Sequence, residues 1–143
     1  MENQDYSNHT RWNKLYHFVL APLLLINLIF SIVRMVQDPG VDRGAYIVMS
    51  LVFVLMLLSF RLHTLRVQDR LIRLEERLRL EKLLSPELAE KATGLRVSQL
   101  IAIRFASDGE LEELVGKIVE GELTEPKEIK LAIKEWRADF LRA

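Results

Sequence analysis

Hydrophobic positions gather in two long runs that contain no charged residue. The first extends from Leu15 to Val33 and the second from Ala45 to Phe60. A bilayer core about 30 Å thick needs roughly 20 helical residues. The second run reaches this length if it is extended to 44–62 and Arg61 turns its guanidinium toward the headgroups. The pattern predicts two membrane-spanning helices, at about 15–36 and 44–62, rather than two buried helices of a soluble protein.

A short connection joins the two predicted spans. It contains Pro39-Gly40, a turn signal, and is too short to form a domain. We therefore expect a transmembrane hairpin over 15–62, with a short tail at 1–14 on the same side as the C-terminus. Residues 61–84 carry seven basic and four acidic side chains. Basic residues near span ends mark the cytoplasmic side, so both termini are predicted to be cytoplasmic.

The second span is expected to continue as a helical stalk over 63–84, because no Pro or Gly interrupts the chain between Gly44 and Ser85. Val67, Leu71, Leu74 and Leu78 follow the 4-3-4 spacing of a helical stripe. Two interpretations remain open. The stalk packs on its own C-terminal helices, or it forms a coiled coil at the axis of an oligomer.

Residues 85–143 are predicted to form a small cytoplasmic segment of short helices. Ser85-Pro86 begins the first helix, Gly94 ends it, and Arg96–Ala106 forms the second. Glu110–Glu120 forms the third and ends at Gly121, and Thr124 caps the last. The last helix is expected to present Ile129, Ile133, Trp136 and Phe140 on one face, with Trp136 buried. No strand is predicted, so the fold class is all-α.

The stalk and the segment that follows it carry net charges of opposite sign. Between Asp108 and Glu125 there are seven acidic residues and one base, Lys117. This acidic stretch can dock on the arginine-rich stalk, within one chain or between two. The alternative is two independent solvated faces, since exposed ion pairs contribute little.

Composition and motifs offer no sign of catalysis. The chain of 143 residues has no cysteine, which excludes a disulfide scaffold, a thiolate metal site and a Cys nucleophile. His9, His17 and His63 lack metal-ligand spacing, and no glycine-rich phosphate loop or nucleophile elbow is present. We expect no enzyme, catalytic residue, cofactor, metal or small-molecule substrate. Acidic residues among the stalk arginines favour lipid headgroups over nucleic acid as a partner.

Polar residues inside the first span are the strongest candidates for an interaction. Asn27, Ser31 and Arg34 lie at i, i+4 and i+7, on one helical face. Helix–helix hydrogen bonding is the favoured interpretation, and the lining of a pore is the other. Ser50 and Ser59 lie on opposite faces of the second span, so one hairpin offers few partners. We therefore expect Asn27 to contact a second copy.

The stretch QDRLIRLEERLRLEKLLSPELAEKATGLRVSQLIAIRFASDGELEELV, Gln68–Val115, resembles a bacterial family of uncharacterised small two-span membrane proteins. Ser98–Leu111 is its most specific part, and the similarity extends to Ile129–Arg142. The resemblance implies a multi-pass protein of the bacterial inner membrane. It supplies no established activity and no catalytic residue.

These observations predict a non-enzymatic integral membrane protein that acts as a self-associating scaffold or accessory subunit. The expected partners are the lipid bilayer, a second copy and, as a further candidate, another membrane protein. The alternative is a small homo-oligomeric channel or transport component lined by the first span. The candidate interaction residues are Asn27, Ser31, Arg34, Leu71, Leu74, Leu78 and Trp136.

Overall fold

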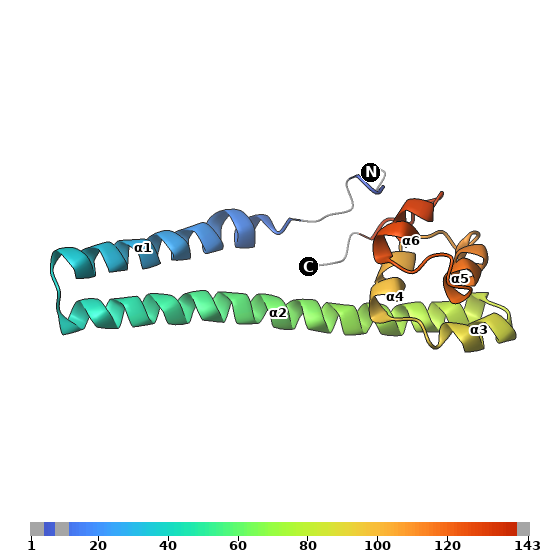
Figure 1. Ribbon diagram of the computed structural model, residues 1–143, viewed down its shortest axis with the longest axis horizontal. Coiled ribbons are helices and arrows are strands. Elements are labelled where there is room, and N and C mark those ends of the chain that lie inside the picture. The colour runs from blue at the N-terminus through green and yellow to red at the C-terminus, as the bar shows by residue number, and fades with distance from the viewer. Residues whose placement is uncertain (1–4, 8–11, 140–143) are drawn as a thin grey trace. The chain divides into compact units, whose positions relative to one another are not determined.

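A computed structural model describes residues 5–7 and 12–139, so His9 and Phe140 lie outside the described residues. The described chain is all-helical, as predicted, with α1 (Ala21–Gln37), α2 (Val41–Leu83), α3 (Pro86–Ala92), α4 (Val97–Ile103), α5 (Leu111–Val119) and α6 (Pro126–Ala132) (Figure 1). It divides into two compact units. Among the described residues, the hairpin unit comprises 12–65, and the C-terminal unit is built mainly from 66–139. Helix α2 contributes to both.

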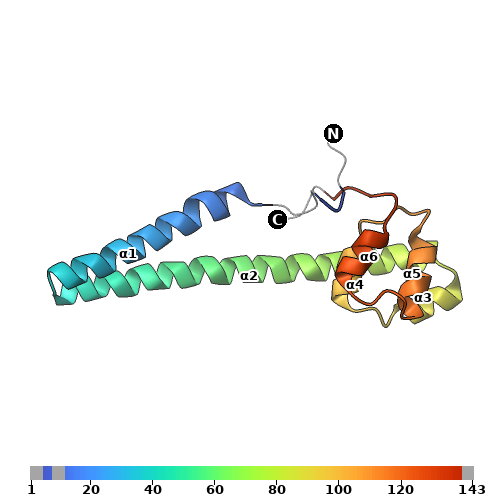
Figure 2. The ribbon, with the colours of Figure 1, turned by 45° about the horizontal axis from the view of Figure 1, so that its top comes forward.

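In the hairpin unit, α1 and the first part of α2 run antiparallel and converge toward their short connection (Figures 1 and 2). The helical stretches Tyr16–Gln37 and Val41–Leu83 are both long and apolar enough to cross a membrane. Only 6% of the most apolar window of each is buried. The core helix of a soluble protein would bury most of such a window, so this exposure suits lipid contact better.

One turn of π-helix, Tyr16–Leu20, precedes α1. The backbone N–H of Ala21 donates to the carbonyl oxygen of Tyr16, five residues earlier. Pro22 follows at once, and proline has no N–H to donate to the carbonyl four residues before it. The wider π turn lies where that ordinary helical bond is missing.

Beyond residue 65, α2 forms one wall of the C-terminal unit. The face it buries carries Ile72, Glu76 and Leu80, and Leu84 just after the helix continues the same spacing of four residues. The short helices α3–α6 gather around this part of α2 (Figure 2). The core contains residues from all of them, chiefly Leu95, Leu100, Ile103, Phe105, Leu111, Leu114, Val115, Ile118, Ile129 and Ile133.

The boundaries of the short helices follow most of the predicted signals. Ser85 is the N-cap residue of α3, and Pro86 occupies its first position. Gly121 follows α5 with φ of 84°, which glycine adopts without the steric cost other residues meet. The cap predicted at Thr124 is wrong. The N-cap of α6 is Glu125, and the Glu128 carboxylate accepts the backbone N–H of both Thr124 and Glu125.

The last helix is shorter than predicted. It ends at Ala132, and Ile133 has an extended backbone. The following strand-like segment returns to the core, where Arg137 N–H donates to the Phe105 carbonyl at 2.7 Å. Trp136 forms an isolated antiparallel bridge with Ala106. Its partly buried indole packs on the Phe105 ring, with centroids 5.1 Å apart.

A carboxylate explains why the helix does not continue. Glu110 accepts hydrogen bonds from the backbone N–H of Lys134 at 2.9 Å and of Glu135 at 3.2 Å. In a continued α6 these N–H groups would donate to carbonyls four residues earlier. The Glu110 carboxylate therefore takes up both backbone donors in place of one further helical turn. A helical stripe through Trp136 does not form.

The predicted docking of acidic residues on the stalk is realised at one point in the C-terminal unit. Arg79 Nη2 lies 2.6 Å from Asp108 Oδ1, and the same nitrogen donates to the Ala106 carbonyl at 2.7 Å. Arg79 Nη1 contacts Glu76 Oε2 at 3.1 Å. Arg79 thus ties the loop before α5 to α2.

Candidate functional site

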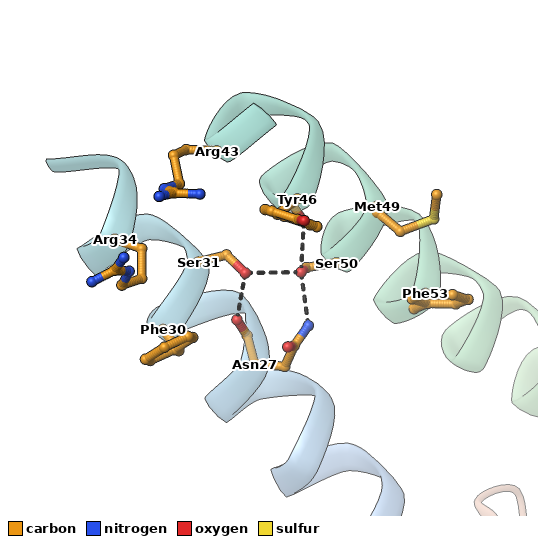
Figure 3. Close-up of a pocket in the computed structure, with 9 residues that line it drawn as sticks. All are labelled: Asn27, Phe30, Ser31, Arg34, Arg43, Tyr46, Met49, Ser50 and Phe53. Carbon is orange, nitrogen blue, oxygen red and sulfur yellow. Dashed lines mark hydrogen bonds between the residues drawn. The ribbon is translucent and has the colours of Figure 1, made fainter. Parts of the chain in front are cut away.

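A groove opens between α1 and α2 near their connection (Figure 3). Its volume is about 470 Å³, within the range of ligand-binding pockets. All of its lining residues belong to the hairpin unit: Asn27, Phe30, Ser31, Arg34, Arg43, Tyr46, Met49, Ser50 and Phe53. The groove combines a polar floor, a cationic end and apolar walls.

The polar floor is a small hydrogen-bond network that joins the two helices. Asn27 Nδ2 donates to Ser50 Oγ at 2.8 Å, and Ser31 Oγ lies 3.2 Å from the same oxygen. Ser31 and Ser50 are both buried, at 7% and 3% exposure. These contacts cross between helices whose surroundings are otherwise apolar, so they fix which faces meet.

The two hydroxyl groups share a limited number of protons. Ser31 Oγ can donate to the Asn27 carbonyl, and Ser50 Oγ to the Tyr46 carbonyl, each at 2.8 Å. Since each hydroxyl carries one proton, at most two of three hydrogen bonds exist at once: these two and the one between Ser31 and Ser50. The backbone carbonyls four residues earlier are the closer acceptors, so the Asn27 amide is the main hydrogen-bond donor across the interface.

The cationic end of the groove holds Arg34 and Arg43. Arg43 Nη2 contacts Asp38 Oδ2 at 3.0 Å, and this carboxylate is largely exposed. The Nε of Arg43 is buried and has no hydrogen-bond partner among the residues that the structure describes. The ion pair therefore leaves part of the Arg43 guanidinium unsatisfied.

The apolar part of the lining consists of Phe30 on α1 and of Met49 and Phe53 on α2, which are 61%, 54% and 46% exposed (Figure 3). Figure 3 shows Phe53 on α2 well away from the arginines. The lining includes no Asp, Glu, His or Lys. The arrangement suits binding of an elongated molecule with one anionic and one apolar end.

The structure brings the predicted polar residues of the first span together, and it gives two of them a partner within the same hairpin. Asn27, Ser31 and Arg34 all line the groove. One hairpin was expected to offer few partners, and a single residue, Ser50, contacts both Asn27 and Ser31. Ser50 is missed when each span is considered separately. Folding the chain back about Pro39-Gly40 places it opposite Ser31.

The predicted stalk residues lie elsewhere, on the C-terminal unit. Leu71, Leu74 and Leu78 are 54%, 56% and 58% exposed, and Val67 is 67% exposed. This exposed stripe of α2, Val67 with the three leucines, takes no part in the core, which uses Ile72, Leu80 and Leu84. Trp136 does contribute to that core, at its edge.

Comparison with known proteins identifies one family. Residues 1–143 match DUF6526, a family of unknown function. This agrees with the resemblance to an uncharacterised family seen in the sequence. No curated protein and no solved structure matches the chain.

Proposed function

We propose that this chain, which belongs to the family of unknown function DUF6526, is a non-enzymatic membrane protein that self-associates as a scaffold or accessory subunit. Its hairpin unit anchors the C-terminal unit at the bacterial inner membrane, with both termini in the cytoplasm. The length, hydropathy and exposure of the two candidate spans support insertion. The exposed stripe of α2 supports self-association.

The exposed stripe is the observation that carries this proposal. The core of the C-terminal unit uses Ile72, Glu76 and Leu80 on α2. Leu74 and Leu78 each lie two positions beyond one of these buried residues, about 200° around the helix. Four exposed apolar side chains at 4-3-4 spacing therefore form a seam that the chain's own core cannot cover.

A second copy of α2 is the partner that this seam fits. Two copies anchored in one membrane are related by a two-fold axis along its normal, so their stalks run parallel. With Leu71 and Leu78 at the first heptad position, Arg70 and Glu75 fall at the flanking positions that face each other between parallel helices. Both side chains are exposed, and each dimer gains two Arg70–Glu75 pairs.

A charge swap tests the geometry. Arg70→Glu and Glu75→Arg each replace two attractive contacts by two repulsive ones, while the double variant restores attraction. We expect each single variant to cost about 1 kcal/mol, or about fivefold in the dimer dissociation constant. The double variant should return to the wild-type value. Native mass and light scattering of the full chain in mild detergent measure the dimer fraction over a dilution series.

The matched control is Arg73→Glu, an exposed charge reversal beside the seam on the same helix. It should leave the dimer fraction unchanged. Leu71→Lys with Leu78→Lys should abolish dimers while helix content stays constant. Single charge reversals without effect, or a double variant that fails to recover, would contradict parallel association through this stripe.

A further inference from the structure

The groove of the hairpin unit spans two dielectric environments if the hairpin inserts as proposed. Arg34 and Arg43 lie within four residues of the helix ends at the connection. Phe53 lies ten positions beyond Arg43, about 15 Å along α2 at 1.5 Å per residue. That is about half of a 30 Å hydrocarbon core. The arginines therefore reach the headgroup layer, and Phe53 lies among acyl chains.

Polar groups within the groove need partners that hydrocarbon cannot supply. Asn27 is exposed, and its one side-chain hydrogen bond among the described residues uses a single N–H. Its second N–H and its carbonyl oxygen remain available. The buried Nε of Arg43 also has no described partner. Unsatisfied polar groups in a membrane are costly, so an occupant with oxygen acceptors is favoured over a plain acyl chain.

We propose that this groove binds one glycerophospholipid molecule from the leaflet at the connection. Its phosphate contacts the guanidinium groups of Arg34 and Arg43, which bind phosphate oxygens through paired N–H donors. One acyl chain lies along Phe30, Met49 and Phe53. The inference rests on membrane insertion, as proposed above, but not on self-association.

A second hairpin fits the same groove less well. To satisfy the arginines it would have to present carboxylates at this depth. The region 15–62 contains two acidic residues, Asp38 and Asp42, and Asp38 already pairs with Arg43. A phospholipid brings the required anion and the apolar tail in one molecule.

The experiment is native mass spectrometry of the delipidated full chain in mild detergent, titrated with dioleoyl phosphatidylglycerol. Wild type should retain one lipid per chain at low lipid concentration. The Arg34→Gln, Arg43→Gln variant should need about tenfold more lipid for the same occupancy, because two charge-assisted contacts are lost. Met49→Trp keeps both arginines but fills part of the apolar lining, and it should also lower occupancy.

Arg61→Gln is the matched control, since Arg61 lies toward the other end of the second span, outside the groove. It should bind lipid as wild type does. Inorganic phosphate in place of lipid separates the two sources of the anion. Phosphate bound as tightly as lipid, and unaffected by Met49→Trp, would replace the lipid site by a simple anion site.

The same spectra report chain stoichiometry. Equal lipid occupancy in all variants would overturn the proposal, and so would loss of dimers in the groove variants without loss of lipid. A monomeric wild-type chain that still retains one lipid would contradict self-association alone. A chain that partitions into the aqueous phase during detergent phase separation would contradict insertion, and both proposals with it.

Discussion

Arg79 is the residue on which the polar contacts of the C-terminal unit converge. Its side chain is 10% exposed and reaches Glu76, Asp108 and the Ala106 carbonyl. Asp108 is 65% exposed, and its hydrogen bonds from Arg79 hold the pKa of its carboxyl below the ordinary value. Glu76 differs, because its side chain is 7% exposed. The same guanidinium therefore meets one solvated and one desolvated carboxylate.

Burial decides the ionisation of Glu76. Desolvation raises the pKa of its carboxyl above the ordinary value of 4.5, and the nearby Arg79 offsets only part of that rise. Protonation thus favours the folded state. The stabilising contribution is fully present below the unfolded-state pKa and is lost as pH rises through the higher folded-state pKa.

Glu76→Gln should therefore raise the free energy of unfolding of the C-terminal unit at pH 7.5, and the gain should shrink toward pH 4.5. Glutamine keeps an oxygen that accepts from Arg79 but carries no charge to desolvate. Urea unfolding in detergent, followed by Trp136 fluorescence in a Trp12→Phe background, measures both values. A gain of equal size at the two pH values, or a variant less stable at pH 7.5, would contradict the burial argument.

At the scale of elements, local signals predicted the helices well and their ends less well. The apolar runs, Pro86 and Gly121 act through neighbouring backbone, so their consequences are readable in sequence order. The end of α6 cannot be read in this way. It depends on the Glu110 carboxylate, which accepts the backbone N–H of Lys134 and Glu135 from 24 and 25 residues away. Periodicity alone continues the helix there.

The same reasoning applies to the groove. The shared face of Asn27, Ser31 and Arg34 follows from helical spacing and was predicted. Its pairing with Ser50 depends on how two helices approach, which spacing within one helix does not determine. The stalk stripe shows the converse case. Spacing showed that the four apolar residues share a face, but only the fold shows that this face is exposed and that the core uses the opposite one.

Gly116 and Gly121, within and just after α5, differ in backbone conformation, so replacing each by alanine should change stability in opposite directions. An added Cβ would meet nothing within 4 Å at either Gly116 or Gly121, so side-chain contacts do not intervene. Gly116 lies inside the helix, and Gly116→Ala should stabilise the C-terminal unit by about 1 kcal/mol. Gly121 has φ of 84°. Gly121→Ala should destabilise it by about 1 kcal/mol, because the left-handed region is unfavourable for alanine.

The Trp136 fluorescence assay applied to both variants gives the sign directly. Each variant serves as the control for the other, since both replace hydrogen by methyl within one short stretch. Changes of the same sign in the free energy of unfolding would contradict a helical Gly116 or a left-handed Gly121.

At the scale of the whole molecule, the proposed topology assigns the connection and the C-terminal unit to opposite sides of the membrane. A hairpin places the connection on one side and both chain ends on the other. The surplus of basic residues over 61–84 predicts that the connection faces outward and the C-terminal unit inward. This arrangement also assigns the phospholipid groove to the outer leaflet.

Two single-cysteine variants decide the orientation. The chain has no native cysteine, so no other substitution is needed. Gly40 lies in the connection and Gly109 lies before α5, and an added Cβ has open space at both. A membrane-impermeant maleimide added to intact cells should label Gly40→Cys and leave Gly109→Cys unlabelled. After the cells are opened, both should react, which confirms that each thiol is accessible. Labelling of Gly109→Cys in intact cells would reverse the topology, and it would move the groove to the inner leaflet without altering its residues.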